Sequence, residues 1–310
     1  MASVDGAPGS RSNPGMNIAQ LAHALVLAPL LLLGAGCGAE SQAHEVLTFT
    51  AIPDDNPTAL TQRFQPLADY LSKQLGVEVR YLPTASYEAS VEAFKNGDVQ
   101  LAWFGGLTWA QARAAVPGAE AIAQGAVDPK FKSYFIAHKD SGIEPSAEFP
   151  QSLAGKTFTF GAATSTSGRL MPEYFIRQAT GKSPAEFFGR ENAYSQSHDQ
   201  TAKLVEAGTF QAGALNYKTY DRMVAEGKVD PAVARIVWTT PEYADYCWTA
   251  HPSLDKSFGE GFTQKLKDAL VGIKDMELLK AVDRSEGLIP ASNADFEVVD
   301  KLARELGFVR

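Results

Sequence analysis

Cysteine is scarce in this sequence: Cys37 and Cys247 are the only two among 310 residues. Two cysteines cannot form a disulfide framework, and they exclude a structural zinc site built from cysteine ligands. The histidines and acidic residues show no spacing typical of a metal site, so we expect neither a metal nor a cofactor. We interpret Cys247 as a small buried hydrophobic residue at the end of a strand; the alternative is a reactive thiol.

Positive charge is also in short supply. Lysine and arginine number 28 against 36 aspartates and glutamates, which gives a formal net charge of -8. This balance argues against nucleic acid and against anionic membrane surfaces as partners. An anion-binding protein of this charge must build its site from local dipoles and hydroxyl groups. The sequence also lacks internal repeats, low-complexity linkers and long runs of like charge.

Long hydrophobic runs are absent apart from residues 18–33, which are rich in Leu and Ala. This run is shorter than the roughly 20 residues of a membrane-spanning helix, and small residues and Cys37 follow it. We predict a signal peptide over residues 1–37, with Cys37 acylated as a lipid anchor. The alternative is ordinary cleavage after Ala43, and the chain could start at Met16. Either route exports a soluble domain.

The rest of the chain alternates between strand and helix patterns. Residues 46–52 are apolar or β-favouring, which predicts a strand. Residues 58–75 carry Leu and Phe at helical spacing, and we expect Gly76 to cap this helix. Further strands are expected at 77–82, 99–103, 120–124, 133–138, 157–161, 212–215, 236–239 and 246–250. The alternation predicts an α/β protein with a mainly parallel sheet. From Phe258 to Phe308 we expect helix, with one break at 288–290.

No flexible linker interrupts this pattern, which favours two lobes that exchange chain. We expect the chain to cross between lobes near 126–133 and again near 241–246. Lobe 1 would then comprise residues 44–130 plus 245–310, and lobe 2 residues 131–244.

The junction from Phe158 to Pro172 reads as strand, polar loop and helix. Four hydroxyl residues, 164–167, and Gly168 precede the helix, where unpaired backbone N–H groups and the helix dipole favour an anion. The alternative is a capped helix with a solvated loop. Arg169 in the first turn would oppose the dipole unless an anion faces it, or unless its side chain points to solvent.

Two other segments resemble ligand-facing positions. Phe104, Gly105 and Gly106 follow a strand, and small residues there let backbone N–H groups approach a ligand. His198 opens a predicted helix just after a strand, where an imidazole could face a ligand or serve the structure alone.

An enzymatic interpretation combines Ser165 or Ser167 with His198 and with Asp199 or Asp245, a hydroxyl, imidazole and carboxylate set. The sequence has no Gly-x-Ser-x-Gly motif, and a row of hydroxyls is more typical of a donor array than of one nucleophile. We therefore expect no enzyme and no catalytic residues. A hydrolase using Ser167 and His198, or an anion-sensing receptor component, stays open as the alternative.

With these segments in view, the chain resembles the phosphate, phosphite and phosphonate family of periplasmic binding proteins of ABC importers. The resemblance spans the mature part and rests on Tyr87, Ala102–Gly105, Lys139–Ser141, Ser165–Gly168 and His198. It implies a type II periplasmic-binding-protein fold, with two α/β lobes around a ligand cleft and two crossover strands. It also implies a small oxyanion ligand, an ABC permease as partner, a monomer, and a place in the periplasm or on the outer face of the cytoplasmic membrane.

The resemblance also implies residue roles. Ser165, Thr166 and Ser167 would bind the oxyanion at the helix N-terminus, and His198 and Tyr87 would complete the cage. The first three and His198 are expected on the second lobe, with Tyr87 on the first.

Other positions bear on the identity of the ligand. Gly105 is expected on the first lobe, and Phe104 stands where the family often has Tyr, which removes one hydroxyl donor. Lys218, after Asn216, stands where aminoalkylphosphonate binders carry a carboxylate; it would attract a bare oxyanion by about 1–4 kcal/mol and repel an amine. Asp245 matches a family carboxylate and could accept a hydrogen bond from a protonated oxyanion.

Three stretches, 52–56, 166–172 and 215–218, look most like the branch named for selenate transport. We take that name as a pointer to inorganic tetrahedral oxyanions. The sequence leaves phosphonate, phosphite, phosphate, selenate and sulfate unseparated.

Overall fold

The computed structural model describes residues 45–310, apart from the side chain of Ala281. The predicted signal peptide and Cys37 lie outside the described residues. The chain divides into two units, residues 1–42 and 43–310, and everything below concerns the second. Within the described part, none of the helices has the length and apolar character needed to cross a membrane.

The first sheet has six strands in the order β11-β4-β10-β3-β1-β2. Its strands are β1 (Leu47–Ala51), β2 (Val79–Tyr81), β3 (Leu101–Phe104), β4 (Glu120–Gly125), β10 (Cys247–Ala250) and β11 (Leu288–Pro290). β1 runs parallel to β2 and β3, whereas β10 runs antiparallel to β3 and β4, and β11 antiparallel to β4.

Helix α1 (Pro57–Leu75) shows how local sequence sets the elements around this sheet. The Asn56 side chain caps its start by accepting from the amides of Thr58 and Ala59, and Gly76 ends it in the left-handed region, with φ of 74°. Its apolar face is buried against the sheet. The other helices of this part are α2 (Tyr87–Asn96), α3 (Gly106–Ala115), α8 (Leu254–Phe258), α9 (Phe262–Val271), α10 (Met276–Ala281) and α11 (Glu297–Glu305).

The second sheet has five strands in the order β7-β6-β8-β5-β9. Its strands are β5 (Ser133–His138), β6 (Phe158–Phe160), β7 (Ala193–Tyr194), β8 (Ala212–Asn216) and β9 (Ala234–Thr239). A five-residue π-helix, Thr166–Leu170, follows β6 and runs into α4 (Met171–Thr180). The remaining helices are α5 (Pro184–Phe188), α6 (His198–Glu206) and α7 (Tyr217–Ala225).

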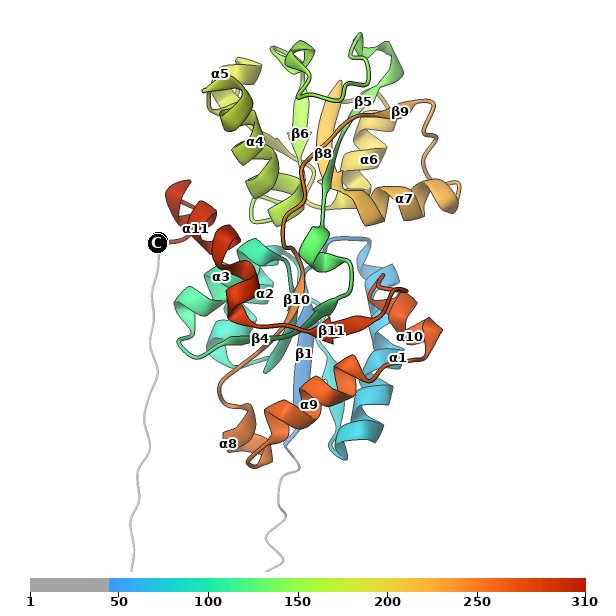
Figure 1. Cartoon of the computed structure of the whole chain (residues 1–310). Helices are drawn as coiled ribbons and strands as arrows, with labels where there is room; N and C mark the ends of the chain where they lie inside the picture. The colour runs from blue at the N-terminus through green and yellow to red at the C-terminus, as the bar shows by residue number, and fades with distance from the viewer. Residues whose placement is uncertain (1–44) are drawn as a thin grey trace, which may run out of the picture. The chain divides into compact units, whose positions relative to one another are not determined.

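The chain passes between the two sheets twice, after β4 and after β9. Figure 1 shows the first passage in green, leading to β5, and the return in orange, from β9 to β10. The two passages are joined by an antiparallel bridge between Phe131 and Tyr243, whose amides each donate to the other's carbonyl at 2.9 and 3.0 Å. The exact lobe boundaries stay a prediction.

Two predictions about the elements are wrong. Both sheets are mixed rather than mainly parallel, because β10 re-enters the first sheet from the opposite side and β5 runs antiparallel to β8 and β9. Residues 288–290 are not a simple break between helices: they form β11, an edge strand on β4.

Cys247 lies at the first position of β10 and is fully buried. Burial raises the pKa of its thiol well above the ordinary value, which disfavours the reactive thiolate. The residue therefore serves as a small hydrophobic side chain of the first sheet.

Candidate functional site

Among the buried polar atoms that lack a hydrogen-bond partner in the described residues, four belong to side chains that the sequence analysis expected at the ligand site. They are Tyr87 Oη, Ser167 Oγ, His198 Nε2 and Asp245 Oδ2. Buried polar groups are nearly always hydrogen-bonded in folded proteins, so such a set points to groups that a ligand satisfies. We call these four residues the oxyanion cluster.

The elements of both sheets supply this cluster. Tyr87 begins α2 and Asp245 precedes β10, both in the first sheet's part of the chain, whereas Ser167 lies in the π-helix and His198 begins α6. Burial raises the pKa of the Tyr87 hydroxyl, and the negative charges of Asp54 and, to a smaller extent, Asp245 raise it further.

The turn before α4 places Ser167 beside His198. Ser165 Oγ accepts from the Gly168 amide at 3.0 Å, and the Gly161 amide donates to the Gly168 carbonyl at 2.9 Å. Gly168 leaves no spare room, because a Cβ there would lie 3.0 Å from Ser165 Oγ and 3.1 Å from His198 Cε1. The hydroxyl cap and the glycine together fix the backbone of the turn that carries Ser167.

His198 is held as a neutral donor. Its Nδ1 accepts from the Asn216 amide at 3.3 Å, so the single proton of the neutral ring sits on Nε2, the atom without a partner. Burial lowers the pKa of His198 to about 4, so the ring is neutral at physiological pH. A neutral N–H donor suits an anion without adding charge.

Asp245 is the acceptor of the cluster. Its Oδ1 accepts from the amides of Gly106 at 2.8 Å and Tyr246 at 2.9 Å, while Oδ2 has no partner within residues 45–310. Burial raises the pKa of Asp245 to about 6. A Cβ on Gly105 would lie 3.1 Å from Asp245 Oδ1, so the close approach of this carboxylate to the start of α3 requires glycine.

Two residues expected to bind the ligand also join segments of the two sheets. Thr166 Oγ1 accepts from the Leu107 amide at 2.9 Å, and this bond, with that of Asp245, satisfies the first amides of α3. Asn216 caps α7 through Oδ1 and donates from Nδ2 to the Tyr246 hydroxyl at 3.0 Å.

Three other residues singled out in the sequence, Lys218, Phe104 and Thr164, contact side chains outside the oxyanion cluster. Lys218 Nζ pairs with Glu286 Oε1 at 2.9 Å. The Phe104 ring is fully buried and packs edge-on against Phe94 at 5.6 Å, so its side chain belongs to the core. Thr164 donates to Glu88 at 3.0 Å across the two parts.

The two orientations expected for Arg169 are wrong. Its guanidinium is buried, pairs with Glu173 and lies 4.4 Å from the centroid of the Phe160 ring. The Glu173 carboxylate one turn along the helix, rather than a ligand or solvent, compensates the charge.

The sequence interpretation missed Asp54 and Tyr246. The Tyr246 hydroxyl donates to Asp54 Oδ2 at 2.8 Å, and the Asp54 carbonyl accepts from the His198 amide at 3.1 Å. Burial raises the pKa of Asp54. A carboxylate just after the carboxyl end of β1 was a usable signal, because ligands of open α/β sheets bind at that edge. No pattern in the sequence indicated that Tyr246 belongs to the site; in the structure its backbone has a positive φ of 47°.

The geometry gives the hydrolase alternative no support. Ser167 Oγ and His198 Nε2 each lack a hydrogen-bond partner, so no hydroxyl–imidazole pair forms, and His198 Nδ1 accepts an amide rather than donating to a carboxylate. Across the described residues, no group of three or more His, Cys, Asp or Glu side chains is arranged to hold a metal ion.

The sequence of this chain is similar to that of a known family of transport proteins. Residues 49–296 match the family described as "ABC transporter, phosphonate, periplasmic substrate-binding protein". A protein of Prochlorococcus marinus (strain MIT 9301), named "Probable ABC transporter phosphite binding protein PhnD1", is 38% identical over 272 residues, which cover 86% of this chain and 91% of that one. The "Phosphate-import protein PhnD" of Mycolicibacterium smegmatis is 29% identical over 278 residues, covering 82% and 84%.

A solved structure gives the same picture of the fold. The structure of PhnD1 from Prochlorococcus marinus (MIT 9301) in complex with methylphosphonate superposes with a TM-score of 0.80 at 38% identity, covering 85% of this chain and 99% of that one.

Proposed function

The chain belongs to the periplasmic substrate-binding proteins of phosphonate ABC transporters, and we propose that it captures a small tetrahedral oxyanion at the oxyanion cluster. The observation that carries this proposal is that all four residues of the oxyanion cluster hold a buried polar atom without a partner in the described chain. Three of their groups are hydroxyl or N–H donors and one is a carboxylate oxygen. This set complements an oxyanion that still carries one hydroxyl.

The carboxylate of Asp245 narrows the ligand class. A hydroxyl on phosphorus can donate to Asp245 Oδ2, whereas sulfate and selenate carry no proton near neutral pH and would face a buried negative charge. We therefore propose phosphite, methylphosphonate or phosphate as ligands in preference to the selenate-type anion. The names of the relatives, which mention phosphite, phosphate and a methylphosphonate complex, agree with this class.

The ion pair of Lys218 weakens the influence on ligand choice that we expect from its charge. With the two parts together its ammonium is paired with Glu286 at 2.9 Å, so its charge is compensated in this arrangement. Discrimination against an amine-bearing phosphonate does not follow from this residue.

The proposed mechanism is closure of two lobes around the anion, followed by delivery to the membrane permease. Tyr87 and Asp245 come from one part of the chain and Ser167 and His198 from the other, so an anion that contacts all four favours the closed arrangement. The lipid anchor at Cys37 and the monomeric state belong to this proposal.

Calorimetry and thermal unfolding with phosphite, methylphosphonate, phosphate, 2-aminoethylphosphonate, sulfate and selenate test the proposal. We expect at least one phosphorus oxyanion to stabilise the protein by about 2.7 kcal/mol at a hundred times its Kd, with sulfate and selenate weaker. Ser167→Ala should weaken that binding, while Ser146→Ala, in a loop of the second sheet, should not. A protein that no member of the panel stabilises would refute the proposal.

A further inference from the structure

Helix α7 presents two cations to acidic side chains of the other sheet's part of the chain. Arg222 Nη2 lies 2.5 Å from Asp55 Oδ2, and its Nε lies 3.8 Å from Asp283 Oδ2. One turn earlier, Lys218 Nζ lies 2.9 Å from Glu286 Oε1. Residues four apart share a helix face, so both cations project to the same side.

We infer that this ion-pair cluster, made of Lys218 and Arg222 with Asp55, Asp283 and Glu286, latches the two lobes in the closed form. α7 continues directly from β8 of the second sheet. Asp55 lies between β1 and α1, and Asp283 and Glu286 lie between α10 and β11, all in the first sheet's part. We call the cluster the α7 latch.

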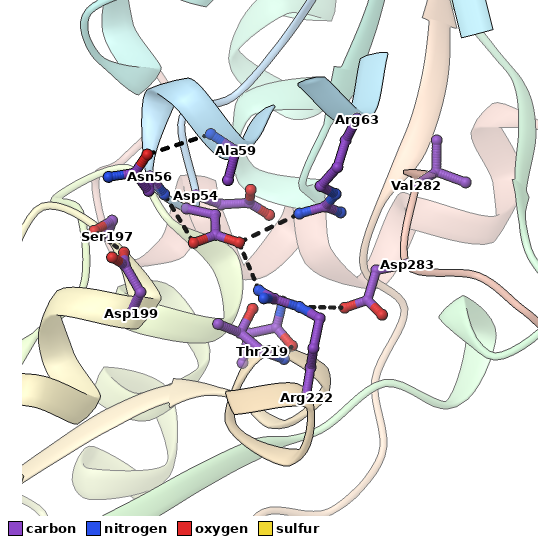
Figure 2. Close-up of polar contacts among 12 residues, drawn as sticks. Asp54, Asn56, Ala59, Arg63, Ser197, Asp199, Thr219, Arg222, Val282 and Asp283 are labelled. Atoms are coloured by element: carbon purple, nitrogen blue, oxygen red, sulfur yellow. Dashed lines mark hydrogen bonds and ion pairs between the residues drawn. The ribbon is translucent and has the colours of Figure 1, made fainter. Parts of the chain in front are cut away.

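The Asp55 carboxylate is positioned before the lobes meet. The Asn56 amide donates to its Oδ1 at 2.8 Å, and Arg63 of α1 lies 3.3 Å from Oδ2. Figure 2 shows Arg63 and Arg222 reaching from opposite sides toward one carboxylate, with Asp283 beside Arg222. The carboxylate side chain is 8% exposed and that of Arg222 is 23% exposed.

These contacts differ from ordinary surface ion pairs in two respects. The Asp55 carboxylate is nearly buried and accepts from two guanidinium groups, which strengthens a pair relative to a solvent-exposed one. Opening the lobes would leave Arg222 with Glu226, the residue after α7, at 3.6 Å. Asp55 and Asp283 would then each lose a cationic partner.

The latch would act on release of the ligand rather than on contact with it. None of its five residues belongs to the oxyanion cluster, and its bonds form only when the two parts are together. Breaking them is part of opening, so they slow dissociation more than they change association. Their screening by salt would make release faster at high ionic strength.

This inference rests on the proposed function, and its test separates the two. The rates of methylphosphonate or phosphite association and dissociation are followed by stopped-flow tryptophan fluorescence in the wild type, Arg222→Gln and Arg235→Gln. Arg235 is the matched control, because it is 26% exposed and its partners, Glu144 and the carbonyls of Lys139 and Ile143, all lie within the second sheet's part.

The ligand should dissociate about tenfold faster from Arg222→Gln than from the wild type, an effect between those expected for losing an exposed and a buried ion pair. Its association rate should change less than about threefold. Arg235→Gln should match the wild type. Raising the salt concentration should accelerate release from the wild type more than from Arg222→Gln, which keeps only the Lys218–Glu286 pair. Arg222→Lys, which keeps the charge, should restore part of the slow release.

A ligand-independent measurement completes the design. Small-angle scattering of the ligand-free protein should show a larger radius of gyration for Arg222→Gln and for Lys218→Gln than for Arg235→Gln. Equal release rates and equal radii in Arg222→Gln and Arg235→Gln would overturn the latch while leaving the proposed function intact. A wild type that binds no oxyanion would instead refute the proposed function, and the scattering comparison would still decide on the latch.

Discussion

Asp245 shows how a single buried carboxylate can select among anions of the same shape. Its Oδ1 is committed to two amides, so Oδ2 alone is available to a ligand. Burial raises its pKa to about 6, above the unperturbed 3.8. The group therefore takes up its proton as the pH falls through about 6, and only then can it donate to an anion that has no proton of its own.

We predict that Asp245→Asn admits sulfate and selenate, with affinity for sulfate at pH 7.5 raised about tenfold or more, because an amide N–H replaces a buried negative charge. In the wild type, sulfate binding should strengthen as the pH falls from about 7.5 to about 5, and in Asp245→Asn it should not. His198, with a pKa of about 4, remains neutral over this window. Calorimetry across the pH series measures both effects.

The matched control is Asp199→Asn, since Asp199 lies beside His198 but its carboxylate accepts from the Ser197 hydroxyl. This variant should keep the anion preference of the wild type. Sulfate binding by the wild type that does not depend on pH would contradict the role given to Asp245.

Some of the site residues could be predicted from the sequence, but their ion-pair partners could not. Ser167 and His198 could be named because each stands at a recognisable junction of strand and helix, and Tyr87 and Asp245 because they match positions of the family that the chain resembles. The partner of Lys218 could not, because Glu286 lies 68 positions away in the chain and only the fold brings it near. A side chain's charge is visible in a sequence, but its compensation is a tertiary property.

At the scale of elements, the turn between β6 and α4 depends on one glycine. A Cβ on Gly168 would lie 3.0 Å from Ser165 Oγ and 3.1 Å from His198 Cε1, so both must shift by a few tenths of an ångström to accept it. We predict that Gly168→Ala raises the Kd for the phosphorus oxyanion about tenfold, because displaced donors lose their alignment. Calorimetry gives the Kd, and thermal unfolding should show only a modest loss of stability.

Gly213→Ala provides the contrast, because a Cβ there would meet Thr201 Cγ2 at 2.9 Å and the Thr159 carbonyl at 3.0 Å inside the second sheet. It should lower the free energy of unfolding by about 1–3 kcal/mol while leaving the Kd of the folded protein close to that of the wild type. The prediction fails if Gly168→Ala binds as tightly as the wild type.

Elements were predictable where their pattern was long and regular. Helix α1 has six buried apolar residues at helical spacing and a glycine cap. By contrast, strand β7 has two residues and strand β11 has three. Short edge strands carry too few residues for a periodicity to show. The direction of β10 was equally hidden, since it depends on which side the chain returns from.

At the scale of the whole molecule, the two-lobe α/β fold expected from the sequence is confirmed by the likeness to the methylphosphonate complex, with its TM-score of 0.80. The first passage between the sheets carries one partner of a buried ion pair, and the other partner, Arg284, lies between α10 and β11. Asp128, between β4 and β5, lies 2.7 Å from Arg284, and its carbonyl accepts from the Asp245 amide at 3.1 Å. Arg284 in turn stacks over the Tyr246 ring at 4.8 Å.

We predict that Asp128→Ala lowers the free energy of unfolding by about 3–5 kcal/mol, because it leaves the Arg284 guanidinium, which is 2% exposed, without its counterion. Denaturant unfolding of the ligand-free protein measures the loss. Asp300→Ala, which removes the partner of the exposed Arg304 on α11, should change stability little. Replacing both Asp128 and Arg284 by apolar residues should recover much of the loss, since no buried charge is then left unpaired; a double variant as unstable as Asp128→Ala would show that the pair does more at the passage than compensate charge.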